Sequence, residues 1–103
     1  MKQELVIRIL KQKQTELSEQ FGVQALLLFG SVARDEASPE SDVDLLVEFD
    51  SVDLMEYAEN HTNFTESLEK LFGRAVDLVT AKYLRNRFFI KEINETKQVL
   101  FAA

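Results

Sequence analysis

The segment from Val23 to Phe29 is the feature that most constrains the fold of this chain. It reads VQALLLF and lies between Gly22 and Gly30. A continuous apolar run of this length is typical of a strand that is buried on both faces. The segment therefore predicts a buried strand, and the residues around it have to be interpreted as parts of the same sheet.

A second segment, from Asp42 to Phe49, predicts another strand by its alternation. It reads DVDLLVEF, and every second residue from Val43 onward is apolar. Because successive side chains of a strand point to opposite faces, Asp42 and Asp44 are expected to share the face opposite the apolar one.

Helical periodicity and glycine caps predict the remaining elements. We expect a helix over about residues 2–20, a single helical turn after Gly30, and a helix over 53–72 that ends at Gly73. A third strand over 75–79 carries Asp77 at its centre, and a helical region over 81–95 precedes a short strand at 99–101. These elements predict an α/β (α+β) fold in which a mixed sheet of about four strands has helices on one face and the carboxylates on the other. At this length, residues 1–103 are expected to form a single domain.

Composition limits the classes of partner. The net charge of −6 argues against nucleic acid as a direct ligand, because a protein that grips a nucleic-acid backbone usually displays a basic patch. The absence of cysteine excludes disulfides, thiolate metal sites and a thiol nucleophile. No apolar run is long enough to span a membrane, and the charged N-terminal stretch is unlike a signal peptide, so we expect a cytoplasmic protein.

The chemistry of the chain is expected to centre on Gly30, Ser31 and three aspartates. A glycine lets the backbone approach phosphate oxygens closely, and Ser31 offers a hydroxyl and a backbone N–H beside it. Asp42 and Asp44 would repel each other on one strand face, and Asp77 is a charge within an apolar strand. A divalent cation would remove the repulsion between Asp42 and Asp44 and would balance the charge of Asp77. Mg²⁺ is the natural candidate, because it prefers hard oxygen ligands and usually joins carboxylates to substrate phosphates. With three carboxylates, two ions can be held, as in-line transfer of a nucleotide requires.

The pattern Gly30-Ser31-x10-Asp42-x-Asp44, with Asp77 on a later strand, resembles the nucleotidyltransferase superfamily that includes the DNA polymerase β type. More narrowly, FGSVARDEASPESDVDLLVEF followed by GRAVDLVT is similar to the minimal nucleotidyltransferases, or MNT proteins. The resemblance covers nearly the whole chain. It implies a nucleotidyltransferase fold in which Asp42, Asp44 and Asp77 are catalytic and bind metal, while Gly30 and Ser31 bind the nucleotide. Arg34 is assigned to the nucleotide-binding residues for its charge, with contact to the partner or a plain surface position as the alternatives.

The same resemblance implies a partner and a reaction. MNT proteins are typically antitoxins of HEPN-domain toxins, and they transfer AMP from ATP to a tyrosine of the toxin in a Mg²⁺-dependent reaction. A hetero-oligomer with such a toxin is therefore expected. The alternative is a catalytically silent antitoxin that neutralises its toxin by binding alone. Asp35 stands where this family often has glycine, and its charge is expected to weaken triphosphate binding.

Other polar and aromatic residues are interpreted as structural. His61 lies on the apolar stripe of its helix and is assigned to the core or an interface. Tyr57 and Tyr83 are assigned to packing. Lys82, Arg85, Arg87 and Lys91 form a local basic cluster, which is interpreted as a solvated helix face.

Overall fold

The protein is described here by a computed structural model, which covers residues 2–34, 36, 41–50, 53–80 and 87–102. The elements follow the chain as α1 (Gln3–Gln12), α2 (Gln14–Phe21), β1 (Val23–Phe29), α3 (Gly30–Ala33), β2 (Val43–Phe49), α4 (Leu54–Phe72), β3 (Val76–Thr80), α5 (Arg87–Thr96) and β4 (Gln98–Ala102).

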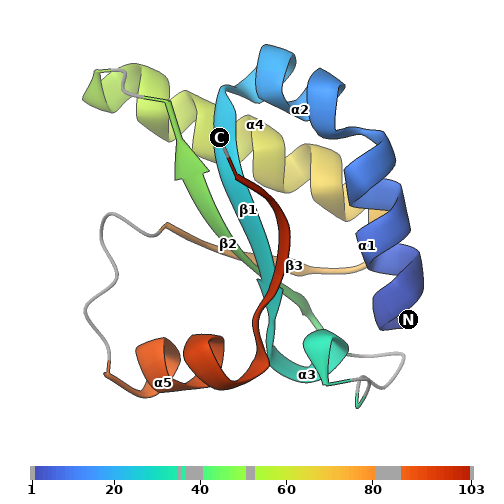
Figure 1. Ribbon diagram of the computed structural model, residues 1–103. Helices are drawn as coiled ribbons and strands as arrows, with labels where there is room; N and C mark the ends of the chain where they lie inside the picture. The colour runs from blue at the N-terminus through green and yellow to red at the C-terminus, as the bar shows by residue number, and fades with distance from the viewer. Residues whose placement is uncertain (1, 35, 37–40, 51–52, 81–86, 103) are drawn as a thin grey trace.

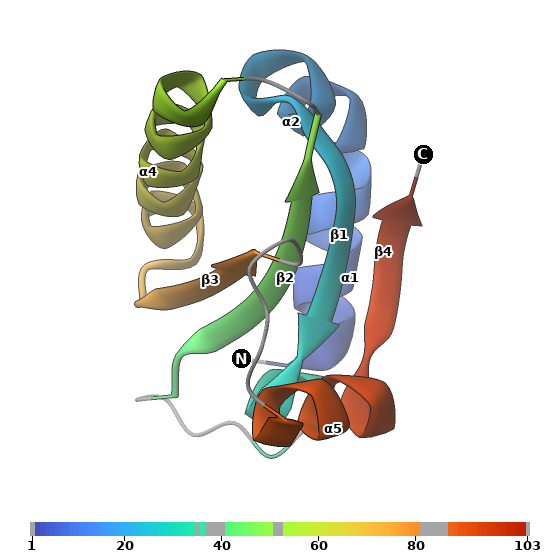
Figure 2. The same ribbon diagram turned by 90° about the vertical axis from the view of Figure 1, so that its left-hand side faces the viewer.

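The described strands, seen in Figure 1 together with the helices, form one four-stranded mixed sheet. Its order is β3-β2-β1-β4, as the labels of Figure 2 show. The central strand β1 pairs antiparallel with β2 on one side and with β4 on the other. β2 pairs in parallel with β3, the strand that α4 connects to it. The predicted mixed sheet of about four strands is confirmed.

The strand β1 is covered on both faces, as its largely apolar sequence predicts, and its polar residue Gln24 is exposed. Leu26 and Leu28 belong to the main core, whereas Phe29 belongs to a second, smaller cluster on the opposite face. In β2, Leu45 likewise lies in the main core and Leu46 in the second cluster. The alternation of β2 is therefore confirmed, and the face that carries Asp44 is the face of the smaller cluster.

The helices are divided between the two faces of the sheet. Residues of α1, α2 and α4 enter the main core, so these helices cover the predicted helical face. α5 differs from the prediction, because its buried Ile93 packs with Phe29 and Leu46 on the other face. Figure 2 shows α1 and α2 behind the sheet and α5 in front of it, at the end where β1 runs into α3. The carboxylate face thus has a helix at one end.

The predicted single helix over residues 2–20 is wrong, because the structure has two helices with a break at Lys13. The break redirects the chain: α1 contacts β4, while α2 contacts α4 and β1. The buried residues Val6, Leu10, Leu17 and Phe21 keep a helix-compatible spacing across the break. Periodicity alone therefore could not reveal it.

The long helix α4 is capped at both ends. Gly73 ends the helix in the left-handed conformation, as the sequence predicts, and the side chain of Asp53 accepts a hydrogen bond from the backbone N–H of Glu56 (2.8 Å) at its start. Leu54, the first residue of the helix, is 73% exposed. Within the described residues, no helix combines the length and the apolar character needed to cross a membrane.

The helical region predicted over 81–95 falls partly on residues 81–86, which lie outside the described residues. Its described part, α5, continues to Thr96. The C-terminal strand predicted at 99–101 is confirmed and is slightly longer.

Replacing Phe64 by alanine tests the main core. Phe64 is fully buried, and its ring centroid lies 5.2 Å from that of Phe21 and 6.1 Å from that of Phe49. Phe64→Ala is expected to lower the free energy of unfolding by about 3–5 kcal/mol because it leaves a cavity between α4, α2 and β2. Urea denaturation measures this loss. Met55→Ala, at a 74% exposed position of the same helix, is the control and should change stability by less than about 0.5 kcal/mol.

Candidate active site

The site is built around the contact between Gly30 and Asp44. Phe29, the last residue of β1, is the register partner of Asp44 in β2, so the chain turns into α3 directly beside the aspartate. Gly30 has φ +75°, and a Cβ at this position would overlap Oδ2 of Asp44 and lie 3.0 Å from its Cγ. Only glycine satisfies both the backbone conformation and the space that Asp44 leaves.

The sheet brings Asp44 and Asp77 together. They are register partners in the parallel pair of β2 and β3, so their side chains stand side by side on the same face. Asp42 comes directly before β2, and its charge acts on Asp44. Asp44 is half-buried, whereas Asp42 and Asp77 are exposed. The three predicted aspartates therefore occupy one edge of the open face.

The start of β2 is held by contacts from the β3 side. The backbone N–H of Val43 donates to the carbonyl of Ala75 (3.0 Å), and the Arg74 guanidinium donates to the carbonyl of Ser41 (3.3 Å). At the start of β3, the backbone N–H of Val76 donates to the Glu69 carboxylate (3.2 Å). These bonds fix the backbone on either side of Asp42.

Partial burial and acidic neighbours disfavour the charged form of Asp44. Partial burial is the largest cause, followed by the charges of Asp77, Glu92 and Asp42; together they raise the pKa of Asp44 to about 6. The charge of Arg34 acts in the opposite direction but does not cancel them. A cation that binds beside Asp44 would stabilise its charged form.

The donor set fits Mg²⁺ in its chemistry. Asp44 and Asp77 offer hard carboxylate oxygens on one face, Asp42 lies near enough for its charge to act on Asp44, and the missing Cβ of Gly30 leaves the space that Oδ2 of Asp44 occupies. Within the part of the chain that is described, no three acidic or histidine side chains converge into a preformed cation site. The arrangement thus supplies the ligands that the prediction requires, and the side chains have to converge when an ion binds.

The predicted nucleotide-binding residues lie in and after α3. Ser31 is partly buried, next to Gly30. Arg34, which follows α3, forms two ion pairs: its Nε lies 3.0 Å from Glu36, and its Nη1 lies 3.0 Å from Glu92 of α5. The pKa of Arg34 is raised, first by its hydrogen bond to Glu92 and second by its hydrogen bond to Glu36. Arg34 therefore keeps its positive charge. Asp35 lies outside the described residues.

Two residues at this site were missed by the sequence analysis, Glu92 and Thr96. The Thr96 hydroxyl accepts a hydrogen bond from the backbone N–H of Gly30 (3.2 Å) and donates one to the carbonyl of Glu92 (2.7 Å). Their spacing of four residues places both on one side of α5, which is a usable signal. It could not be interpreted without knowing which face of the sheet α5 covers.

The structure places some of the residues that the sequence assigns to packing or to a solvated surface. The His61 ring Nε2 lies 2.9 Å from the carbonyl of Leu78, which links α4 to β3 and supports its assignment to the core. Tyr57 packs edge-on against Phe49, as expected. Of the basic cluster, Arg87 is exposed and Lys91 is paired with Glu95, while Lys82, Arg85 and also Tyr83 lie outside the described residues.

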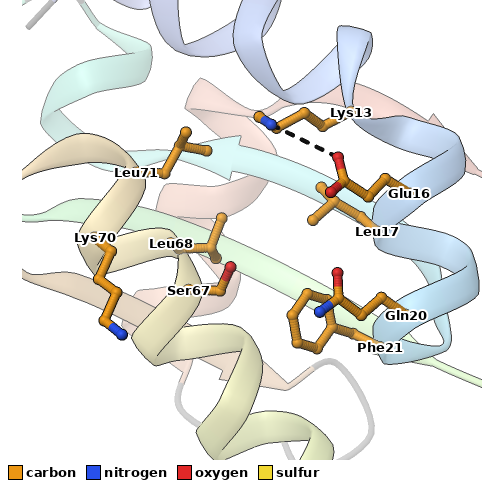
Figure 3. A pocket seen from close by; sticks show the side chains of 9 residues that line it. All are labelled: Lys13, Glu16, Leu17, Gln20, Phe21, Ser67, Leu68, Lys70 and Leu71. Atoms are coloured by element: carbon orange, nitrogen blue, oxygen red, sulfur yellow. Dashed lines mark ion pairs between the residues drawn. The ribbon is translucent and has the colours of Figure 1, made fainter.

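A groove of about 280 Å³ lies elsewhere, between α2 and α4 (Figure 3). Its lining includes Leu17, Phe21, Leu68 and the lysines Lys13 and Lys70. These residues belong to the helical layer, on the other side of the sheet from Asp44. The groove is therefore separate from the carboxylates.

The contact between Gly30 and Asp44 can be isolated by comparing two glycine substitutions. Gly30 and Gly73 have similar φ values, +75° and +65°, but a Cβ at Gly73 would have no neighbour within 4 Å. Both alanine variants are expected to lose about 1 kcal/mol through backbone strain, and Gly30→Ala should lose about 1–3 kcal/mol more because it displaces Asp44. Thermal and urea unfolding of both variants measure the difference. Equal losses would contradict the steric role of Asp44.

The raised pKa of Asp44 predicts a pH-dependent effect of Asp44→Asn. The native state holds this proton up to about pH 6, whereas the unfolded chain releases it near its ordinary value of 3.8. The contribution of the Asp44 carboxyl to the free energy of unfolding is thus complete below about pH 4 and is lost as the pH rises through about 6.

In buffer that lacks divalent cations, Asp44→Asn should therefore raise the free energy of unfolding at pH 7.5 by about 1 kcal/mol, after allowance for solvent screening. At pH 4 the increase should be much smaller. Melting temperatures at the two pH values check this. Glu19→Gln removes an exposed charge from α2 and is the control. A gain that is the same at both pH values would contradict the prediction.

Comparison with known proteins agrees with this arrangement. Residues 10–100 match the family model described as a nucleotidyltransferase domain. The protein adenylyltransferase MntA of Thermococcus cleftensis is 42% identical over 79 residues, which are 76% of each chain. A solved structure described as a putative minimal nucleotidyltransferase is 32% identical, covers 91% of this chain and 92% of its own, and gives a TM-score of 0.71.

A further structural neighbour shares the fold at lower identity. It is a chain from a complex of a tri-AMPylated HEPN toxin of Shewanella oneidensis with an MNT antitoxin, with 19% identity and a TM-score of 0.60. The alignment covers 94% of this chain and 73% of that one. The family match, which spans most of the sequence, shows that the chain belongs to the nucleotidyltransferase domain family and is a transferase.

Proposed function

We propose that the chain transfers AMP from ATP to a tyrosine hydroxyl of a HEPN-domain toxin, and so acts as the antitoxin of that toxin. The observation that carries the proposal is the placement of two aspartates. Asp44 and Asp77 are register partners on one face of the sheet, and Asp44 lies against Gly30. Support for the AMP group comes from the related MntA, which is named as a protein adenylyltransferase. Support for the partner comes from the structural neighbour in complex with a modified HEPN toxin.

In this reaction the acceptor oxygen forms a bond to the α-phosphorus of ATP, the bond from that phosphorus to the bridging oxygen breaks, and pyrophosphate leaves. Mg²⁺ ions held by Asp42, Asp44 and Asp77 would supply the neutralisation of phosphate charge and the acidification of the acceptor hydroxyl that this transfer needs. Asp44 is well suited to such a place, because partial burial and then its acidic neighbours disfavour its charge, and a bound cation would stabilise that charge.

The residues of α3 and the turn after it hold the triphosphate in this proposal. Gly30 lets the backbone approach the phosphate oxygens, and Ser31 offers its hydroxyl beside it. Arg34 contributes a guanidinium whose planar N–H groups suit phosphate oxygens. The acceptor reaches the α-phosphate from the open side of the sheet, where Asp42 and Asp77 are exposed.

The setting proposed for this reaction follows from the same chemistry. The acidic chain is expected to act on a protein acceptor without direct binding to nucleic acid. We place the pair in the cytoplasm, where ATP and Mg²⁺ are supplied together, as a hetero-oligomer of the chain with its toxin.

One observation favours a second candidate, an antitoxin that neutralises its toxin by binding alone. The described carboxylates do not converge into a preformed cation site. A chain of this kind would keep the sheet and the partner surface while leaving the three aspartates unused.

A transfer assay separates the two candidates. The chain, its cognate toxin, Mg²⁺ and ATP labelled on the α-phosphate are incubated together, and label on the toxin is measured. The double variant Asp42→Asn/Asp44→Asn should transfer at least about a hundredfold more slowly, because metal-assisted charge stabilisation contributes several kcal/mol. Glu48→Gln, an exposed acid-to-amide change on the same strand, is the control and should transfer normally.

The same mixtures are tested for inhibition of the toxin. If the double variant neutralises the toxin as well as the parent chain does, and no label moves in either mixture, the enzymatic proposal fails and neutralisation by binding stands.

A further inference from the structure

Helix α5 contacts two groups of the segment that is proposed to bind the triphosphate. Glu92 accepts a hydrogen bond from Nη1 of Arg34 (3.0 Å), and Thr96 accepts one from the backbone N–H of Gly30 (3.2 Å). Both acceptor atoms are oxygens, and a nucleotide would likewise accept hydrogen bonds through the oxygens of its phosphate groups. The helix therefore presents its own oxygen acceptors to the donors that the nucleotide is expected to use.

The position of Glu92 is fixed by its neighbours on α5. The hydroxyl of Thr96 donates to the backbone carbonyl of Glu92 (2.7 Å), so the residue that contacts Gly30 is tied to the turn that carries Glu92. Ile93, next to Glu92, is 5% exposed and packs with Phe29 and Leu46. Glu92 thus stands on an anchored turn of helix, beside α3.

A carboxylate and a phosphate compete for a guanidinium because both accept hydrogen bonds from its planar fork of N–H groups. The ion pair between Arg34 and Glu92 is partly open to solvent, with both side chains 37% exposed. Pairs with such exposure contribute little to stability and are screened by salt. A triphosphate, which carries more charge than one carboxylate, is able to replace Glu92 on Arg34.

Glu92 also adds negative charge where the nucleotide has to arrive. Its charge is one of those that disfavour ionised Asp44, so it acts across the site and is not confined to Arg34. Before a nucleotide binds, this charge therefore opposes the approach of phosphate groups in addition to occupying their donor.

We propose that Glu92 determines the affinity of this chain for nucleoside triphosphates by occupying on Arg34 the place of a phosphate oxygen, so that binding requires the displacement of Glu92. The proposal rests on the proposed function, because it takes the triphosphate to bind beside Gly30 and Arg34. It adds an intramolecular competitor from a helix that the sequence analysis had not placed at the site.

The test measures binding of Mg²⁺–ATP to the full chain by calorimetry, without the toxin, so that no transfer to a partner occurs. Glu92→Gln is expected to lower the dissociation constant about threefold to tenfold at low salt, and less at high salt, because one charge and one competing pair are removed. Glu95→Gln is the matched control: it removes the same charge from the same helix, at an exposed residue paired with Lys91. It should leave the constant unchanged within about twofold.

A second pair of variants separates competition on Arg34 from general repulsion. Arg34→Gln removes the contested donor and should weaken binding. In that background, adding Glu92→Gln should change the dissociation constant by much less than it does in the parent chain. Melting temperatures of all variants without nucleotide should agree closely, because the ion pair is exposed, and this excludes a purely structural effect.

Three results would overturn the proposal. Unchanged binding by Glu92→Gln would show that Glu92 does not compete, and weaker binding would indicate a direct role of Glu92 with the cation. A gain of equal size in the Arg34→Gln background would show that the effect does not pass through Arg34. In these cases the parent chain still binds Mg²⁺–ATP and the proposed function stands, whereas absence of binding by the parent chain would overturn both.

Discussion

The close approach of Gly30 to Asp44 is the constraint on which the rest of the site depends. The chain leaves β1 with a positive φ and passes so near to the Asp44 carboxylate that no Cβ fits between them. This approach puts the backbone of Gly30 next to Asp44, a carboxylate whose pKa is raised to about 6. In the proposed function, a phosphate group that contacts the backbone at Gly30 would thereby come within reach of the proposed metal ligands.

The sheet concentrates negative charge at this place, and the protein bears the electrostatic cost. Asp44 and Asp77 are register partners on neighbouring parallel strands, and Asp42 and Glu92 add to the same field. Like charges so arranged are destabilising unless a cation or a proton relieves them. The acidic face therefore does not contribute to the stability of the fold, and its arrangement supports the proposal that it binds a cation during function. The main core, on the other face, supplies that stability.

Helix α5 ties the carboxylate face to the segment that follows β1. It covers part of this face through Ile93, and it offers Thr96 and Glu92 to Gly30 and Arg34. In the proposed function, these contacts would couple the position of the helix to the binding of phosphate by Gly30 and Arg34. A helix that packs over the carboxylate face would then adjust the affinity for the nucleotide.

The sequence by itself determined the sheet and the identity of the three aspartates. The largely apolar run of β1 and the alternation of β2 are local patterns, set by which side chains must leave water, and glycine caps mark helix ends through their φ values. The roles of Asp42, Asp44 and Asp77 remain predictions. Only the tertiary structure decided the register that places Asp77 beside Asp44, the break at Lys13, the side of the sheet that α5 covers, and the pairing of Arg34 with Glu92. These features depend on contacts between residues far apart in the chain, 58 positions for Arg34 and Glu92. Periodicity indicates which residues are buried but not which residues they pack against.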